Sequence, residues 1–220
     1  MVIEGEANER FICDLGGKLM KKITLGPKTA LFPVPATLVG VHVNSNPNFM
    51  VVAWCGIANS APPMISIAMQ HGRYSYEGIK QNMVFSVNVP SSNLMRETDY
   101  CGITSGSKID KVDICGFNIF YGKLSNAPLI EECPVNLECK VVHILDLGSH
   151  TMIIGSIEET HVSEVCLSDG IPDVSKIKPF SYVGAGKQEY RILGEVIGKA
   201  HNVGRELEPQ RKRENAPENH

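Results

Sequence analysis

The chain has 220 residues, a length that a single all-β domain commonly reaches. Its 21 basic and 24 acidic residues give a formal net charge of −3, which argues against a nucleic-acid partner because no basic excess is present. The N-terminus lacks the basic head and apolar centre of a secretory signal, and no run approaches the roughly 18 apolar residues of a membrane span. We therefore expect a cytoplasmic protein without membrane contact.

The cysteines are odd in number and widely spaced, with neither a Cys-x-x-Cys motif nor a Cys/His pair at zinc-finger spacing. This pattern predicts no disulfide framework and no metal site. We expect most of these residues to be small buried thiols in a reducing compartment. They are Cys13, Cys55, Cys101, Cys115, Cys133, Cys139 and Cys166.

Apolar segments rich in Val and Ile alternate with clusters of Gly, Pro, Asn and Ser, which is typical of successive strands. The predicted strands are 34–43, 49–58, 64–70, 83–89, 135–147, 151–165 and 181–183. Two short helices are predicted at 75–81 and 94–100. The sequence thus predicts a mostly β domain over residues 1–200, followed by a polar tail over 201–220 that has little to bury.

The predicted strand 49–58 carries Trp54, the only tryptophan, and precedes a Ser-Ala-Pro-Pro turn at 60–63. Two consecutive prolines fix two φ angles and remove two N–H donors, so this turn predicts a rigid corner between two strands. Small neighbours around Trp54 favour a flat slot, and we expect the corner to hold a planar ligand against this strand.

Segments 135–143 and 151–161 alternate with period two around a turn at 147–150, which predicts a long hairpin. Apolar side chains occupy one face of the first arm. Its other face carries Asn136, Glu138 and Lys140, and we expect that face to be wet.

Two polar segments are candidates for binding an anion. The loop 104–111 combines hydroxyls, a glycine and two lysines, and segment 71–75 places Arg73 and Ser75 at a strand end. The alternatives are a solvated turn for the loop and ordinary surface polarity for the strand end. Neither contains a P-loop, because Gly-x-x-x-x-Gly-Lys-Ser/Thr does not occur here.

Two further side chains have both a structural and a functional interpretation. His150 lies at the predicted hairpin turn, where it either supports the turn or donates a hydrogen bond to an electron-rich ring. Cys55 suggests a nucleophile, but no Cys-His-Asn pattern accompanies it.

Taken in order along residues 20–200, these motifs resemble the flavin reductase-like proteins with an FMN-binding split barrel, and most closely the flavoredoxin branch. The segments that carry the resemblance are 48–56, 60–63, Arg73 with Ser75, 85–90, 105–111, 134–142, 148–150 and 190–194.

The resemblance implies a Greek-key split barrel, a homodimer and a non-covalent FMN in a groove at the dimer interface. It implies Asn48, Trp54, Cys55 and Gly56 as the wall beside the isoalloxazine ring. It further implies Arg73, Ser75, Ser105 and Lys111 near the phosphate or ribityl chain, His150 near the ring or phosphate, and Tyr182 with Phe180 closing the pocket.

The chain departs from the broader family pattern at residues 53–56, where Ala-Trp-Cys-Gly replaces the usual Ser or Thr near the ring. This departure leaves open whether FMN is exchanged as a substrate or retained as a prosthetic group, and the likeness to flavoredoxin favours retention. The flavin would carry the redox chemistry, so no catalytic side chain is assigned.

Three hypotheses remain open at this point. The first is an oxidoreductase that takes electrons from NADH, NADPH or a redox protein. The second is an FMN-binding electron carrier without reductase activity. The third is a non-redox β-barrel that binds another phosphorylated ligand, such as a pyridoxal-type phosphate.

Overall fold

The computed structural model describes residues 22–184 and 186–207. These residues fall into two units, 22–30 and 31–207, and every described helix and strand lies in the second. Cys13 and residues 208–220 of the predicted tail lie outside the described residues. Within them, no helix combines the length and the apolar character that crossing a bilayer requires.

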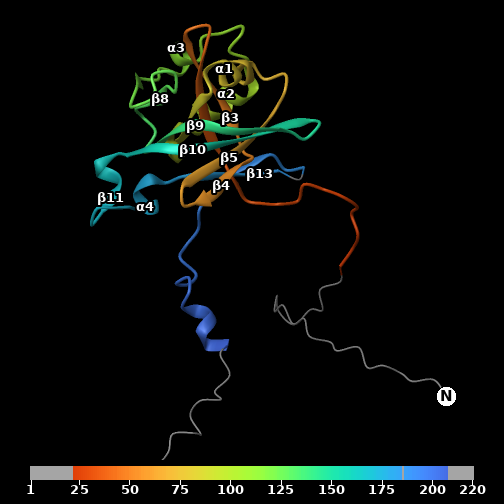
Figure 1. Cartoon of the computed structure of the whole chain (residues 1–220). Coiled ribbons are helices and arrows are strands. Elements are labelled where there is room, and N and C mark those ends of the chain that lie inside the picture. Colours follow the sequence, from red (N-terminus) through yellow and green to blue (C-terminus); the bar gives the residue numbers. More distant parts are fainter. Residues whose placement is uncertain (1–21, 185, 208–220) are drawn as a thin grey trace, which may run out of the picture. The chain divides into compact units, whose positions relative to one another are not determined.

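Seven antiparallel strands form the main sheet of the second unit (Figure 1). In spatial order they are β3 (Asn46–Val52), β2 (Thr37–Val43), β6 (Val84–Val89), β9 (Val135–Asp146), β10 (His150–Val162), β5 (Pro63–Gln70) and β4 (Cys55–Ser60). The smaller sheets are β1 (Val34–Pro35) with β13 (Phe180–Val183) and β14 (Glu189–Ile192), β7 (Ile119–Phe120) with β8 (Leu129–Ile130), and β11 (Leu167–Ser168) with β12 (Ile171–Pro172).

The helices are short and connect the strands. They are α1 (Tyr74–Asn82), α2 (Met95–Ile103), α3 (Lys111–Cys115) and α4 (Val174–Ile177), with single 3₁₀ turns η1 (Ser92–Leu94), η2 (Glu164–Cys166) and η3 (Val203–Leu207). The two helices predicted from sequence are therefore present as α1 and α2. In Figure 1, α1, α2 and α3 lie on one side of the β9–β10 hairpin, and β4 and β13 lie on the other.

The predicted strand 49–58 is wrong, because the chain bends at Ala53 and Trp54 and continues as two strands, β3 and β4. The bend is held by the Trp54 carbonyl, which accepts a hydrogen bond from the Ala68 N–H at 2.8 Å. The two prolines lie at the other end of β4, where Ser60 pairs with Pro63 in a tight hairpin. At about 3.3 Å per residue this corner is roughly 20 Å from Trp54, so it does not form the expected wall beside the indole.

Helix α1 packs against β2, and this contact sets the position of the first turn of the helix. Gly78, in the middle of the helix, lies so close to β2 that a Cβ atom there would overlap the carbonyl oxygen of His42. The Asn82 amide donates to that same carbonyl at 2.9 Å. A glycine and an asparagine one turn apart therefore hold this helix against the sheet.

Two apolar clusters form the core. The first lies within the main sheet and includes Ile67, Phe85, Ile153 and the thiol of Cys139. The second lies between β2, β3 and the helices α2 and α3. It is built from Leu38, Phe49, Cys101, Phe117, Ile130 and Cys133. All six described cysteines are free thiols, and four of them are buried.

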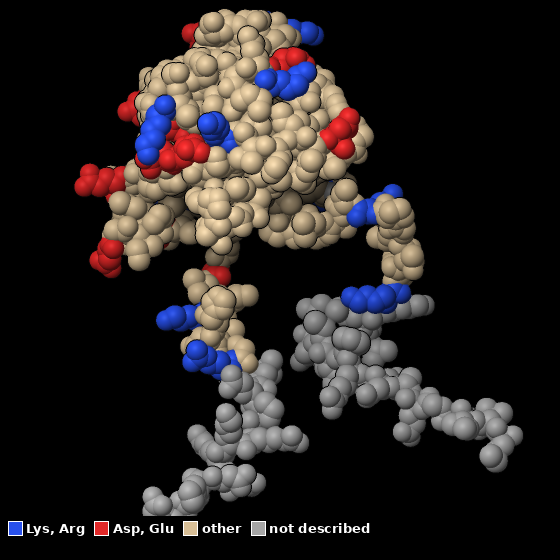
Figure 2. All heavy atoms as spheres, viewed as in Figure 1, with Lys and Arg blue, Asp and Glu red and all other residues tan. Residues whose placement is uncertain are grey.

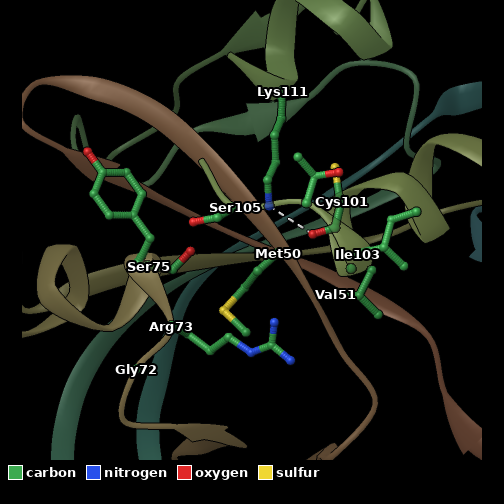
Figure 3. Close-up of a pocket in the computed structure, with 12 residues that line it drawn as sticks. Met50, Val51, Gly72, Arg73, Ser75, Cys101, Ile103, Ser105 and Lys111 are labelled. Carbon is green, nitrogen blue, oxygen red and sulfur yellow. Dashed lines mark hydrogen bonds between the residues drawn. The ribbon is translucent and has the colours of Figure 1, made fainter. Parts of the chain in front are cut away.

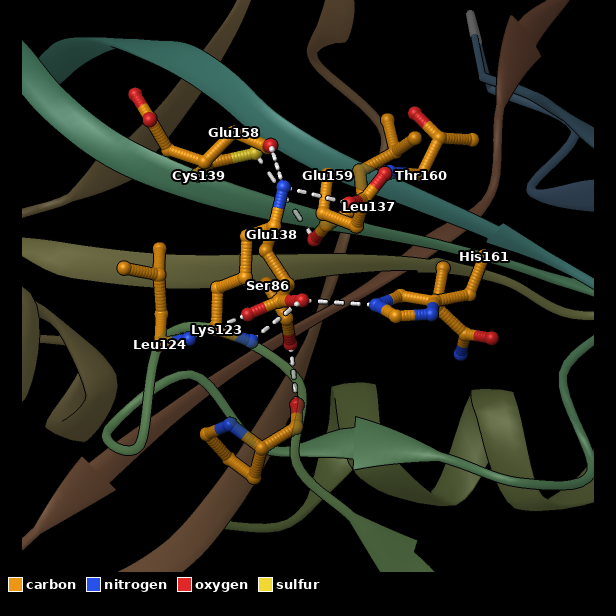
Figure 4. A network of polar contacts seen from close by, with 12 residues as sticks. Ser86, Lys123, Leu124, Leu137, Glu138, Cys139, Glu158, Glu159, Thr160 and His161 are labelled. Atoms are coloured by element: carbon orange, nitrogen blue, oxygen red, sulfur yellow. Dashed lines mark hydrogen bonds and ion pairs between the residues drawn. The ribbon is translucent and has the colours of Figure 1, made fainter.

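The expectation that Asn136 and Glu138 face water is wrong. Both side chains are buried, and Glu138 has 0% of its surface exposed, because the segment between α3 and β9 folds over this face of the hairpin. The carboxylate accepts hydrogen bonds from the backbone N–H groups of Lys123 (3.1 Å) and Leu124 (2.6 Å). It is also bonded to His161 Nε2 at 2.8 Å (Figure 4).

These bonds give Glu138 an unusual electrostatic position. Burial alone would raise the pKa of its carboxyl, but the bonds from His161, Leu124 and Lys123 together hold that pKa below its ordinary value. Glu138 is therefore a buried anion that ties a surface loop to the sheet. Elsewhere, on the face of the molecule seen in Figure 2, basic and acidic side chains are interspersed.

Candidate functional site

Three neighbouring hollows lie along β3, and we name each after one lining residue. The Arg73 hollow, of about 180 Å³, is lined by Met50, Val51, Gly72, Arg73, Tyr74, Ser75, Cys101, Gly102, Ile103, Thr104, Ser105 and Lys111 (Figure 3). The Trp54 hollow, of about 150 Å³, is lined by Met50, Val51, Val52, Ala53, Trp54, Ala68, Met69, Gln70, Arg73 and His150. The Asn46 hollow, of about 280 Å³, is lined by Val43, Asn46, Pro47, Asn48, Tyr74, Gly106, Lys108, Ile109, Asp110 and Lys111.

The Arg73 and Trp54 hollows form one groove, because Met50, Val51 and Arg73 line both. The groove follows β3 toward the bend at Trp54. Met50 and Val51 form an apolar floor where the two hollows join, Arg73 reaches the same junction, and polar side chains line the rest of the Arg73 hollow (Figure 3). A ligand that fills it would therefore be planar or apolar at one end and polar at the other.

The Arg73 end of the groove is built to attract an anion. Arg73 and Lys111 bring two cationic side chains to a lining that contains no Asp or Glu. Arg73 is also the N-cap residue of α1, so the N–H groups of Tyr74 and Ser75, which begin this helix and have no intrahelical acceptors, lie at the hollow, while the Tyr76 N–H donates to the Arg73 carbonyl. Hydroxyls of Ser75, Thr104 and Ser105 add further donors. Such a set of donors suits a phosphate group.

Lys111 differs from a typical surface lysine because only 4% of it is exposed. Its ammonium donates to the carbonyl oxygens of Phe49 and Cys101, both at 2.8 Å, which ties α3 to β3 and α2 (Figure 3). Burial lowers the pKa of Lys111, and the nearby Arg73 guanidinium acts in the same direction. An anion in the hollow would relieve both effects, since it would stabilise the charged ammonium.

The Trp54 end of the groove carries two rings. The indole is 46% exposed, and the imidazole of His150 lies against it with ring centroids 4.3 Å apart and planes tilted by 43°. His150 is the first residue of β10 and pairs with Gln70 of β5, so the sheet register places it beside the bend. The Ser149 hydroxyl lies 2.9 Å from His150 Nδ1 and fixes the ring orientation. The exposed part of this tilted pair offers an aromatic surface to a ligand ring.

The structure brings together six of the eleven residues that the sequence singled out. Trp54, Arg73, Ser75, Ser105, Lys111 and His150 all line the groove. Asn48 lines only the Asn46 hollow, on the other side of Ser75, and so lies away from the Trp54 end. In a single copy of the chain, Asn48 therefore does not lie at the Trp54 end, where a ligand ring is expected.

Four predicted residues lie outside the groove of this copy, and their roles stay predictions. Cys55 packs against the core of the sheet, where burial raises the pKa of its thiol to about 11, which does not suit a nucleophile. Gly56 lies on the exposed edge strand β4. Tyr182 pairs with Val34 and Tyr190 in the small sheet, and Phe180 packs edge-on against Tyr190.

Sequence reasoning missed the floor of the groove and one hydroxyl. Met50 and Val51 are ordinary apolar strand residues, and no local signal distinguishes them from core. Thr104 is the first residue of the hydroxyl-rich loop 104–111 that the sequence singles out, although the sequence analysis assigns no role to its own hydroxyl.

Comparison with known proteins agrees with this geometry. Residues 29–169 match the family described as flavin reductase like domain. This match covers more than half of the chain, and the chain therefore belongs to the flavin reductase-like family. The resemblance seen in the sequence is thus confirmed.

The chain is similar to several individual proteins. An uncharacterized protein of Archaeoglobus fulgidus is 32% identical over 146 residues, which is 66% of this chain and 81% of that protein. The crystal structure of flavoredoxin from Methanosarcina acetivorans is 36% identical with a TM-score of 0.81, covering 86% of this chain and all of that one. Flavoredoxin of Desulfovibrio vulgaris is 37% identical with a TM-score of 0.78, over 84% of this chain and all of that one. The predicted mostly β split barrel with few short helices is confirmed.

Proposed function

We propose that this chain binds FMN non-covalently and serves as a flavoredoxin-type oxidoreductase that keeps its flavin bound. The observation that carries the proposal is the continuous groove, which has two cations and no carboxylate at one end and an aromatic pair at the other. Membership of a flavin-related redox family supports it. Bound FMN would supply hydride or single-electron chemistry.

The residues present fit such a ligand. Arg73, Ser75, Thr104 and Ser105 would hold a phosphate together with the first turn of α1, while Lys111 would contribute its charge from behind. Trp54 and His150 would cover one side of a planar ring and exclude water from it. We assign no side chain to proton transfer, so the catalytic set stays empty in this proposal.

The visible spectrum of the purified protein tests the proposal. We expect the protein to show flavin absorbance at about 450 nm, either when it is first isolated or after FMN is added. A colourless protein that gains no such band contradicts the proposal, and a band near about 390 nm would instead favour a pyridoxal-type ligand. Adding NADH or NADPH then separates two forms of the function. Rapid loss of the flavin absorbance band indicates a reductase. An unchanged band indicates a carrier that exchanges electrons with another redox protein.

We also propose that the protein is a homodimer. Supporting this, β4 is an edge strand of the main sheet, exposed over most of its length, and it carries Ile57 with 72% of its surface accessible. An exposed edge with a large apolar side chain is suited to contact with another chain. Light scattering on the purified protein should give twice the chain mass of 24.1 kDa, and a monomer would contradict the proposal.

Trp54→Ala should weaken FMN binding about tenfold, because the ring would lose its aromatic cover at one end of the groove. Isothermal titration with FMN measures the change. The matched control is Tyr121→Ala, since Tyr121 is equally exposed, at 45%, and also packs against a histidine, His42, but lies outside the groove. If both variants lose the same affinity, Trp54 has no specific contact with the flavin.

A further inference from the structure

A thin partition separates the Arg73 hollow from the Asn46 hollow. Tyr74 and Lys111 line both hollows, so the two spaces lie next to each other. Ser75 lines only the first, and Asn48 lines only the second. Because these two side chains are bonded to each other, with Asn48 Nδ2 donating to Ser75 Oγ at 2.7 Å, the partition is one side-chain pair thick.

The partition is rigid. Ser75 is 1% exposed and Asn48 is 6% exposed, and each is held by its own element, the first turn of α1 and strand β3. On the side of the Asn46 hollow, Gly106 lies so close that a Cβ atom would overlap the side-chain oxygen of Asn48. The loop therefore packs closely against the amide oxygen of Asn48, while the amide nitrogen is bonded to Ser75.

The partition lies in line with the groove. From the bend at Trp54 the groove follows β3 past Met50 and Val51 to the Arg73 hollow, and Asn48 is the next residue on the face of that strand that carries Met50. A flavin that ends in a phosphate monoester is complete at this point. FAD carries an adenylate beyond that phosphate, and the direct continuation into the Asn46 hollow is closed.

We infer that Asn48, held by Ser75 and Gly106, is a specificity-determining residue that selects FMN against FAD. This inference rests on the proposed function, since it assumes that the phosphate of the flavin occupies the Arg73 hollow. Removing the Asn48 amide would join the Arg73 hollow, of about 180 Å³, to the Asn46 hollow, of about 280 Å³. The joined space would have room for the adenylate of FAD.

The test compares the affinities of FMN and FAD for the full-length chain freed of flavin, by quenching of flavin fluorescence. We expect the wild type to bind FMN at least about 100-fold more tightly than FAD, and Asn48→Ala to narrow that ratio at least about tenfold. The matched control is Asn46→Ala, which removes the same side chain from the same strand and the same hollow but leaves the partition intact. Its ratio should equal that of the wild type.

The outcomes separate this inference from the proposed function. A wild type that binds neither flavin overturns both, whereas one that binds FAD as tightly as FMN overturns only the inference. An unchanged ratio in a folded Asn48→Ala also overturns it. Thermal unfolding monitors the fold, and if Asn48→Ala does not fold, Asn48→Ser replaces it. That variant shortens the side chain but keeps a hydroxyl opposite Ser75, so an unchanged ratio in it overturns the inference equally.

Discussion

Glu138→Ala should lower the free energy of unfolding by about 3–5 kcal/mol, the largest stability effect that we expect from a single side chain here. The substitution leaves the N–H groups of Lys123 and Leu124 without their acceptor and removes the partner of His161. Buried polar groups without partners carry their full desolvation cost. Urea denaturation followed by circular dichroism measures the loss.

A neighbouring carboxylate provides the matched control. Glu159 pairs with Glu138 across the β9–β10 hairpin and forms an ion pair with Lys123 at 2.7 Å, but it lies at the surface. Glu159→Ala should leave the urea midpoint close to that of the wild type, because exposed ion pairs contribute little. Equal losses for the two variants would show that burial is not what makes Glu138 important.

The Glu138 carboxylate should make the stability of the protein sensitive to acid. The pKa of Glu138 is lowered in the folded state, so its contribution is complete above the ordinary value of 4.5 and is lost as the pH falls through the lower, folded value. Glu138→Gln has no such titration. Its stability at neutral pH should be lower than that of the wild type, but it should decline less between about pH 5 and about pH 3. Parallel declines in both proteins would contradict this assignment.

Arg73→Ala should weaken FMN binding roughly 10- to 100-fold while changing riboflavin binding little, because a bond from a charged group to phosphate is worth about 1.5–3 kcal/mol. Riboflavin lacks the phosphate, so the ratio of the two affinities isolates the anion site. Titration of the flavin-free chain with each ligand measures that ratio.

Lys80→Ala is the control for charge. Lys80 lies in the last turn of the same helix, where it pairs with Glu77 at 3.0 Å, and it does not line the groove. It should leave both affinities unchanged. Arg73 is a cleaner test than Lys111, whose ammonium also bonds two backbone carbonyls, so Lys111→Ala would disturb the fold together with the site. If Arg73→Ala weakens FMN binding and riboflavin binding equally, the phosphate of FMN does not occupy this hollow.

Most strands of the main sheet and the first two helices could be predicted because their signals are local. Period-two alternation located the hairpin that became β9 and β10, and short stretches of helical pattern located α1 and α2. The ordered series of motifs also led to the correct family. Each of these inferences uses neighbours within a few residues.

The failures all depend on distant parts of the chain. Glu138 has the spacing of a solvent-facing residue, and only the segment that folds over it makes it buried. The bend at Trp54 is held by Ala68 on another strand. Lys111 belongs to a loop with the composition of a solvated turn, but two carbonyls from β3 and α2 draw its ammonium inward. No pattern within the loop itself indicates this.

The close packing of α1 on β2 depends on Gly78 and Asn82, which do not line the groove. These two residues nevertheless set the position of the proposed anion site. Any residue larger than glycine at position 78 would have to push the helix away from the His42 carbonyl. Arg73 and Ser75 would move with it, since they belong to the turn that begins that helix. The proposed phosphate affinity thus depends on the backbone spacing between α1 and β2, at a position that does not line the groove.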